Sequence, residues 1–95
     1  MTLSMHNLVH VFCGGHLNSI FEATNDPLFP SLHAYVDKIF ERWLRRHPNS
    51  AELYPTDPGV PYGHRGNDRM VPFLPVVENR HMMRSCITFG YDYED

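Results

Sequence analysis

The sequence predicts a mainly α-helical N-terminal half, followed by a proline-rich, extended C-terminal half with short edge strands. Two observations support this division. Residues 3–13, and again the stretch from Asn25-Asp26-Pro27 to about Arg46, follow the three- and four-residue spacing of a helix that has one inward face. Prolines then crowd residues 48–75 and interrupt regular structure there. At 95 residues the chain makes one domain at most, so 1–47 and 48–95 are two parts of it.

The first predicted helix covers residues 3–13. Leu3, His6, His10 and Cys13 follow one another at spacings of three, four and three residues, which places them on one stripe. The pair Gly14-Gly15 supplies the permissive backbone that ends a helix. Residues 16–24 are expected to form a loop.

The second predicted helix starts at Asn25-Asp26-Pro27 and runs to about Arg46. Asn25 or Asp26 can accept hydrogen bonds from the free amides of the first turn, and proline is tolerated there. His47-Pro48 ends the helix, because the residue before proline avoids helical geometry. Its apolar stripe consists of Phe29, Leu32, Val36, Ile39, Phe40, Trp43 and Leu44. Its outer face is expected to carry Lys38, Glu41, Arg42 and Arg45.

In the proline-rich half, residues 71–77 and 87–89 are the candidates for short edge strands. The formal net charge of −3 and the lack of a basic run argue against a nucleic-acid partner. A membrane-spanning helix needs about 18 or more consecutive apolar residues, and the sequence has no such run.

Three histidines carry the functional signal. His6 and His10 are four residues apart, so a helix places both imidazoles on one face. His33 lies on the inward side of the second helix and can complete a three-nitrogen site with an open position. Imidazole suits zinc, copper, iron and nickel alike, so the spacing does not choose the metal. The alternative to a metal site is that the three histidines are ordinary residues of the core with no metal bound. Cys13 is either a further ligand or, in the favoured interpretation, a buried structural thiol.

The combined pattern closely resembles the second copper half-site of tyrosinases, in the type-3 copper family. The resemblance is carried by His6-Asn7, His10, Gly14-Gly15, Asp26-Pro27, Phe29, His33, Asp37 and Trp43. Further matches resemble the animal pigment-forming, or melanin-producing, branch and extend over nearly the whole chain. They are Trp43 to Pro48, Tyr54-Pro55, Met70 to Phe73 and Gly90 to Tyr93.

The resemblance implies a four-helix bundle that holds two copper ions, each bound by three histidines. It implies that His6, His10 and His33 bind one of these ions, and that dioxygen oxidises phenols to catechols and catechols to quinones. Asn7 matches an asparagine that helps to hold a water near the metal and so assists deprotonation of a phenol. Asp37 matches a residue that fixes the helix or its neighbours without binding the metal. By the same resemblance, residues 48–95 continue the catalytic domain.

The chain also departs from the family pattern. Leu32 stands where many members have a second histidine, and Pro30-Ser31 replaces apolar residues. No first-copper histidine triad precedes His6, so the resemblance implies a missing first half and an inactive isolated chain.

Two other functions stay open. One is a zinc-holding tautomerase of the same pigment pathway, and the other is a non-catalytic metal-binding fragment. The sequence does not choose between monophenol and catechol, or fix the disulfide state of Cys13 and Cys86. The compartment is equally open, since only the resemblance suggests the secretory pathway or a pigment organelle.

Overall fold

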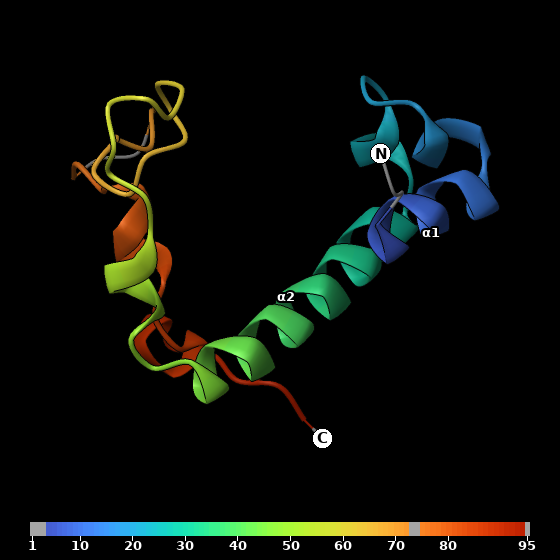
Figure 1. Cartoon of the computed structure of the whole chain (residues 1–95). Coiled ribbons are helices and arrows are strands. Elements are labelled where there is room, and N and C mark those ends of the chain that lie inside the picture. The colour runs from blue at the N-terminus through green and yellow to red at the C-terminus, as the bar shows by residue number, and fades with distance from the viewer. Residues whose placement is uncertain (1–3, 73–74, 95) are drawn as a thin grey trace. The chain divides into compact units, whose positions relative to one another are not determined.

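The computed structural model describes residues 4–72 and 75–94, and in these it is mainly α-helical, as predicted (Figure 1). It contains two α-helices, α1 (Met5–Cys13) and α2 (Leu28–Arg46), with short 3-10 turns between and after them. The chain divides into two compact units, Met1–Phe40 and Glu41–Asp95, each of which is described by itself. Within the described residues, neither helix combines the length and the apolar character that a membrane crossing requires.

Local polar groups set both ends of α1. The Ser4 hydroxyl accepts a hydrogen bond from the Asn7 amide at 3.3 Å, which satisfies one free donor of the first turn. At the other end the Gly14 amide donates to the His10 carbonyl at 3.2 Å. Gly14 and Gly15 both have positive φ, of 66° and 57°, so the predicted glycine stop is confirmed. Leu3, at the predicted start, lies outside the described residues.

The predicted bounds of α2 are also confirmed. The Asp26 carboxylate accepts from the Leu28 amide at 2.9 Å, and α2 begins at Leu28. Pro30 lies in the first turn, where its missing N–H costs no intrahelical hydrogen bond. The helix ends at Arg46, directly before His47-Pro48.

The two units have small cores. In the first unit Leu17 and Ala23, from the loop between the helices, are buried, with exposed fractions of 1% and 8%. In the second unit Leu44 and Cys86 are the buried apolar residues. Much of the predicted stripe of α2 is solvent-accessible, including Ile39 at 52% exposure. A pair of helices cannot cover every apolar side chain, and so polar contacts define much of the local geometry.

The expectation that Glu41 lies on the outer face of α2 is wrong. Glu41 is 4% exposed because the segment Ser85–Cys86 packs over it. Its carboxylate accepts three hydrogen bonds, from the Ser85 hydroxyl at 2.6 Å, the Cys86 amide at 2.7 Å and Arg45 Nε at 2.6 Å. Arg45 also donates to Asp92 at 2.7 Å, so one turn of α2 holds both ends of the 85–92 segment.

These hydrogen bonds change the acidity of Glu41. The Ser85 hydroxyl, the Cys86 amide and Arg45 all favour the charged carboxylate, and they lower the pKa of Glu41 to about 2 although burial acts in the opposite direction. The Tyr93 amide and Arg45 similarly lower the pKa of Asp92. Burial, followed by the charge of Glu41, raises the pKa of the Cys86 thiol, which makes it a poor nucleophile at neutral pH.

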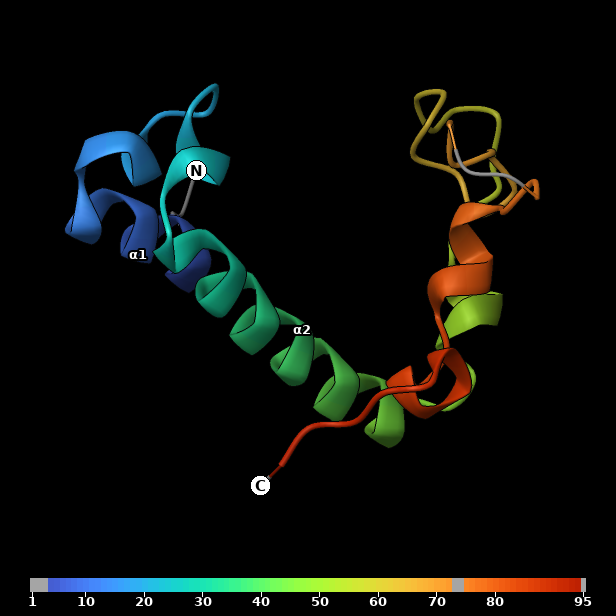
Figure 2. The ribbon, with the colours of Figure 1, turned by 180° about the vertical axis from the view of Figure 1, so that it is seen from behind.

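The proline-rich half is held by hydrogen bonds across its loops. The 3-10 turns Ser50–Leu53 and Asn79–Met82 lie side by side (Figure 2). The buried Asp68 carboxylate accepts from the Gly63 and Arg65 amides, and Asn79 donates to the carbonyls of the same two residues. These paired contacts hold the loop around residues 63–68 in one conformation, in the way that a regular sheet would hold strands.

The predicted edge strands are not present in the described residues. Residues 87–89 belong to the 3-10 turn Cys86–Phe89, because the Ser85 side chain caps it by accepting from the Ile87 amide. Around the other candidate, 71–77, a single antiparallel bridge joins Arg69 to Glu78. Residues 73 and 74 lie outside the described part. A strand needs a partner to pair with, and local β-propensity does not supply one.

We expect Glu41→Gln to destabilise the chain. The amide offers one acceptor oxygen to three donors, so at least one of them loses its partner, which costs about 1–3 kcal/mol. Urea unfolding at neutral pH measures this cost. The exposed Glu52→Gln in the same unit is the matched control and should change stability by less than about 0.5 kcal/mol. Equal stability of the two variants would contradict the role of Glu41.

The low pKa of Glu41 predicts a pH dependence of its own. A depressed folded-state pKa stabilises the fold above the ordinary carboxyl value of 4.5, and this stabilisation is lost as the pH falls towards about 2. The difference in urea midpoint between the natural chain and Glu41→Gln should therefore shrink across that window. A difference that stays constant from pH 6 to about pH 2.5 would show that the carboxylate charge is not what stabilises the fold.

Candidate metal centre

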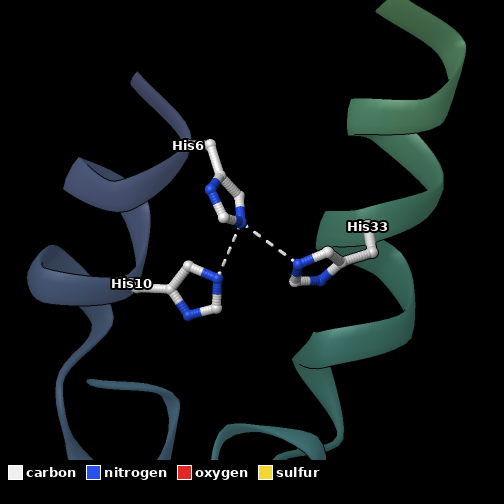
Figure 3. A group of neighbouring side chains, drawn as sticks. All are labelled: His6, His10 and His33. Atoms are coloured by element: carbon white, nitrogen blue, oxygen red, sulfur yellow. Dashed lines mark hydrogen bonds between the residues drawn. The ribbon is translucent and has the colours of Figure 1, made fainter. Parts of the chain in front are cut away.

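The three predicted histidines meet in the first unit. His6 and His10 extend from successive turns of α1, and His33 extends towards them from the N-terminal part of α2 (Figure 3). His6 Nε2 lies 3.0 Å from His10 Nε2 and 3.1 Å from His33 Nε2. All three side chains are half-buried, and their potential ligand atoms lie within 4.8 Å of one another.

Backbone carbonyls fix the tautomers of two of the rings. His10 Nδ1 lies 2.6 Å from the Leu17 carbonyl oxygen, and His33 Nδ1 lies 3.0 Å from that of Phe29. A carbonyl only accepts, so each Nδ1 carries the hydrogen and donates it. The Nε2 of both rings then presents a lone pair to the centre of the cluster, which is the protonation state that a metal requires.

This arrangement fits a metal ion. The lone pairs of His10 and His33 both face His6 Nε2, and a neutral His6 has at most one hydrogen there to share between them. A cation at the common point satisfies all three nitrogens. Around a tetrahedral ion with metal–nitrogen distances near 2.0 Å, ligand nitrogens lie roughly 3.3 Å apart, close to the observed spacing.

Phe29 forms one wall of the cluster. Its ring stacks on His33 with a centroid distance of 3.9 Å and an interplanar angle of 23°, and it meets His10 edge-on at 6.3 Å. The same residue therefore holds the His33 ring by its carbonyl and packs against it with its side chain.

A cavity of about 440 Å³ opens beside the histidines, within the size range of small-molecule sites. Asn7 lines it next to His6 and His10, and its side-chain amide has no hydrogen-bond partner among the described residues. Leu17, Ile20, Ala23 and Phe29 also line the cavity and make part of its wall apolar. The cavity thus combines apolar side chains, the amide of Asn7 and the histidine cluster.

Other candidate residues lie apart from this site. Cys13 is exposed and free, so the favoured expectation of a buried thiol is wrong, and it is not among the converging ligands. Cys86, the other free cysteine, is buried in the second unit. His47 stacks on Trp43 and donates to its carbonyl at 2.8 Å. Among the residues that the structure describes, only the three-histidine cluster gathers three or more candidate metal ligands.

Sequence reasoning missed the role of Leu17. Leu17 lies in the stretch that was expected to be a plain loop. It contacts His10 through its backbone carbonyl, which every residue type has, so the sequence carries no sign of this contact. Phe29 was assigned to an apolar stripe and to the family pattern, and its contact with His33 was not predicted. Its position four residues before His33 was the available signal, because on a helix the carbonyl of residue i−4 lies next to the side chain of residue i.

The fold and the site together define a helix-borne, three-histidine candidate metal centre, and the comparisons with known proteins agree with it. Residues 1–46 match the family model described as the common central domain of tyrosinase. The chain is 43% identical over 90 residues to the tyrosinase of Gallus gallus and 42% identical over 92 residues to that of Canis lupus familiaris. These matches cover 95% and 97% of the chain but 17% of each relative.

A third relative is the 5,6-dihydroxyindole-2-carboxylic acid oxidase of Carassius auratus, which is 41% identical over 96% of the chain and 17% of its own length. No solved structure matches. The chain belongs to the tyrosinase family, and it spans about one sixth of the length of the curated relatives that it matches.

We expect Phe29→Leu to lower the free energy of unfolding by about 0.5–1.5 kcal/mol, the usual worth of an aromatic pair beyond its buried area. Thermal unfolding followed by circular dichroism measures the change. Phe12→Leu is the matched control, because Phe12 is 90% exposed and its loss should change little. An equal effect of the two substitutions would mean that the stack on His33 does not contribute.

Proposed function

We propose that His6, His10 and His33 bind one copper ion, and that this ion is one of a pair in a protein that oxidises phenols or catechols to quinones with dioxygen. The convergence of the three Nε2 atoms carries the proposal. Family membership supports copper over the other metals that imidazole accepts. A pair of ions requires a second set of ligands, which we propose comes from a first copper half that this chain does not supply.

The residue ranges take their roles from this proposal. Residues 1–47 form the second copper-binding half of a catalytic domain, and 48–95 form a C-terminal segment of the same domain. On this proposal the isolated chain is inactive, because the oxidation needs two copper ions and this chain supplies the ligands of one.

When bound, copper supplies the redox chemistry that passes electrons from the substrate to dioxygen. Two catechols give up two electrons and two protons each, and one dioxygen takes up all four to form two waters. The chain's own residues bind the metal and orient the substrate. His10 and His33 keep their Nδ1 hydrogens on carbonyls, so their Nε2 atoms stay available as ligands. The apolar wall of the cavity, which includes Ile20 and Phe29, suits an aromatic ring.

We propose that Asn7 assists proton transfer from the substrate. It follows His6 directly and lines the cavity, and its side-chain amide has no hydrogen-bond partner within residues 4–72 and 75–94. An amide can accept from a water and donate to an oxygen at the same time. We propose that Asn7 holds a water beside the ligands and that this water takes the proton of an incoming phenol.

The ligand assignment predicts which substitutions remove the metal. His10→Ala or His33→Ala should abolish stoichiometric copper binding in the natural protein at this site, because two nitrogens do not complete it. Metal analysis of the purified protein measures this. His64→Ala is the control, since His64 is an exposed histidine of the other unit, and it should keep the full complement. Full metal content in His10→Ala would refute the assignment.

The proposed role of Asn7 separates the two substrates. Asn7→Leu, of similar size, should slow the oxidation of a monophenol by about 10²-fold or more, the usual contribution of assisted proton transfer, and affect catechol oxidation much less. Oxygen uptake by the natural protein with each substrate measures the ratio. A native protein that holds zinc and consumes no oxygen would instead favour the tautomerase alternative, since zinc has no redox chemistry.

A further inference from the structure

We infer that the turn from Gly14 to Leu17 is a positioning element, which sets the tautomer and the orientation of His10 through the Leu17 carbonyl. The inference rests on the proposed metal-binding function of the three histidines. It extends that proposal to a turn that supplies no metal ligand.

The two carbonyl contacts have different origins. His33 uses the carbonyl of Phe29, four residues earlier in the same helix, and any regular helix presents an oxygen there. His10 instead uses the carbonyl of Leu17, seven residues later and outside α1. The chain has to turn back on itself for this oxygen to reach the ring. The His10 contact is also the shorter, at 2.6 Å against 3.0 Å.

Glycine makes this reversal possible. Gly14 has φ 66° and ψ −158°, a region that is essentially restricted to glycine, and Gly15 follows with φ 57°. A Cβ at Gly14 would meet no atom within 4 Å, so the requirement for glycine lies in the backbone and not in space. The 3-10 turn Gly15–Asn18 then directs the Leu17 carbonyl towards His10.

Burial holds the carbonyl in place. The Leu17 side chain is 1% exposed and is the most deeply buried in the chain's described part. Since the side chain is fixed, its carbonyl has little freedom to leave the ring. Without this contact both neutral tautomers are open to His10, and one of them places a hydrogen on the Nε2 atom that has to bind the metal. Loss of such an outer contact usually weakens metal binding about 10- to 100-fold.

The test compares Gly14→Ala with Gly63→Ala. Gly63 has φ 93°, would also meet no atom within 4 Å and lies in the other unit, so it imposes the same kind of backbone strain away from the site. Nitrogen NMR of the imidazoles in the metal-free protein, at about pH 8, reports the tautomer of each histidine. Titration with Cu²⁺ reports the dissociation constant.

We expect His10 to carry its hydrogen on Nδ1 in the natural protein and in Gly63→Ala. In Gly14→Ala this hydrogen should move partly to Nε2, and Cu²⁺ should bind about 10- to 100-fold more weakly. A folded Gly14→Ala that keeps both the Nδ1 tautomer and the affinity would overturn the inference. If no variant and not even the natural protein binds Cu²⁺, the proposed function fails, while the tautomer result still decides the inference.

A second variant covers the case in which Gly14→Ala does not fold. Replacing the Leu17–Asn18 amide by an ester, through chemical synthesis, keeps every side chain and makes the Leu17 carbonyl a weaker acceptor. The His10 tautomer should shift in the same direction. An unchanged tautomer in the ester variant would overturn the inference equally.

Discussion

His6 Nε2 lies about 3 Å from the Nε2 atoms of both His10 and His33, and one shared hydrogen cannot serve both contacts. The arrangement of the three rings in the first unit is best understood from this constraint. Two of the rings already donate their Nδ1 hydrogens to carbonyls, which turns their Nε2 lone pairs towards His6 Nε2. Neutral nitrogens in that arrangement repel unless a hydrogen or a positive ion lies between them. A site built in this way has the ligand protonation state that a metal needs before any metal arrives.

The ring orientations come from two different sources, one regular and one irregular. Helix geometry alone brings Phe29 to His33, whereas His10 depends on a glycine turn and on one buried leucine. His6 has no Nδ1 partner among the described residues. The cluster therefore combines two rings whose orientation is fixed by carbonyls with one, His6, that lacks such a contact among the described residues.

The sequence predicted the features that depend on neighbours along the chain. Gly14-Gly15, Asp26-Pro27 and His47-Pro48 end or start helices by local backbone chemistry, and the helices have those bounds. The meeting of His6, His10 and His33 followed from helical spacing together with an inward face. The burial of Glu41 did not follow, because it depends on Ser85 and Cys86, more than forty residues away. The edge strands failed for the same reason, since pairing is a property of two segments.

Glu41 and the histidines show two uses of polar groups in units with little apolar burial. Around Glu41 both carboxylate oxygens accept hydrogen bonds, three in all, and these lower the pKa of Glu41, so the cluster stabilises structure. Around the histidines the lone pairs outnumber the hydrogens and a cavity lies alongside. In both clusters directional hydrogen bonds, and not large buried apolar areas, fix the positions of the side chains. The surplus of acceptors at the histidines is the physical difference that makes this cluster a candidate binding site, whereas the Glu41 cluster is a structural anchor.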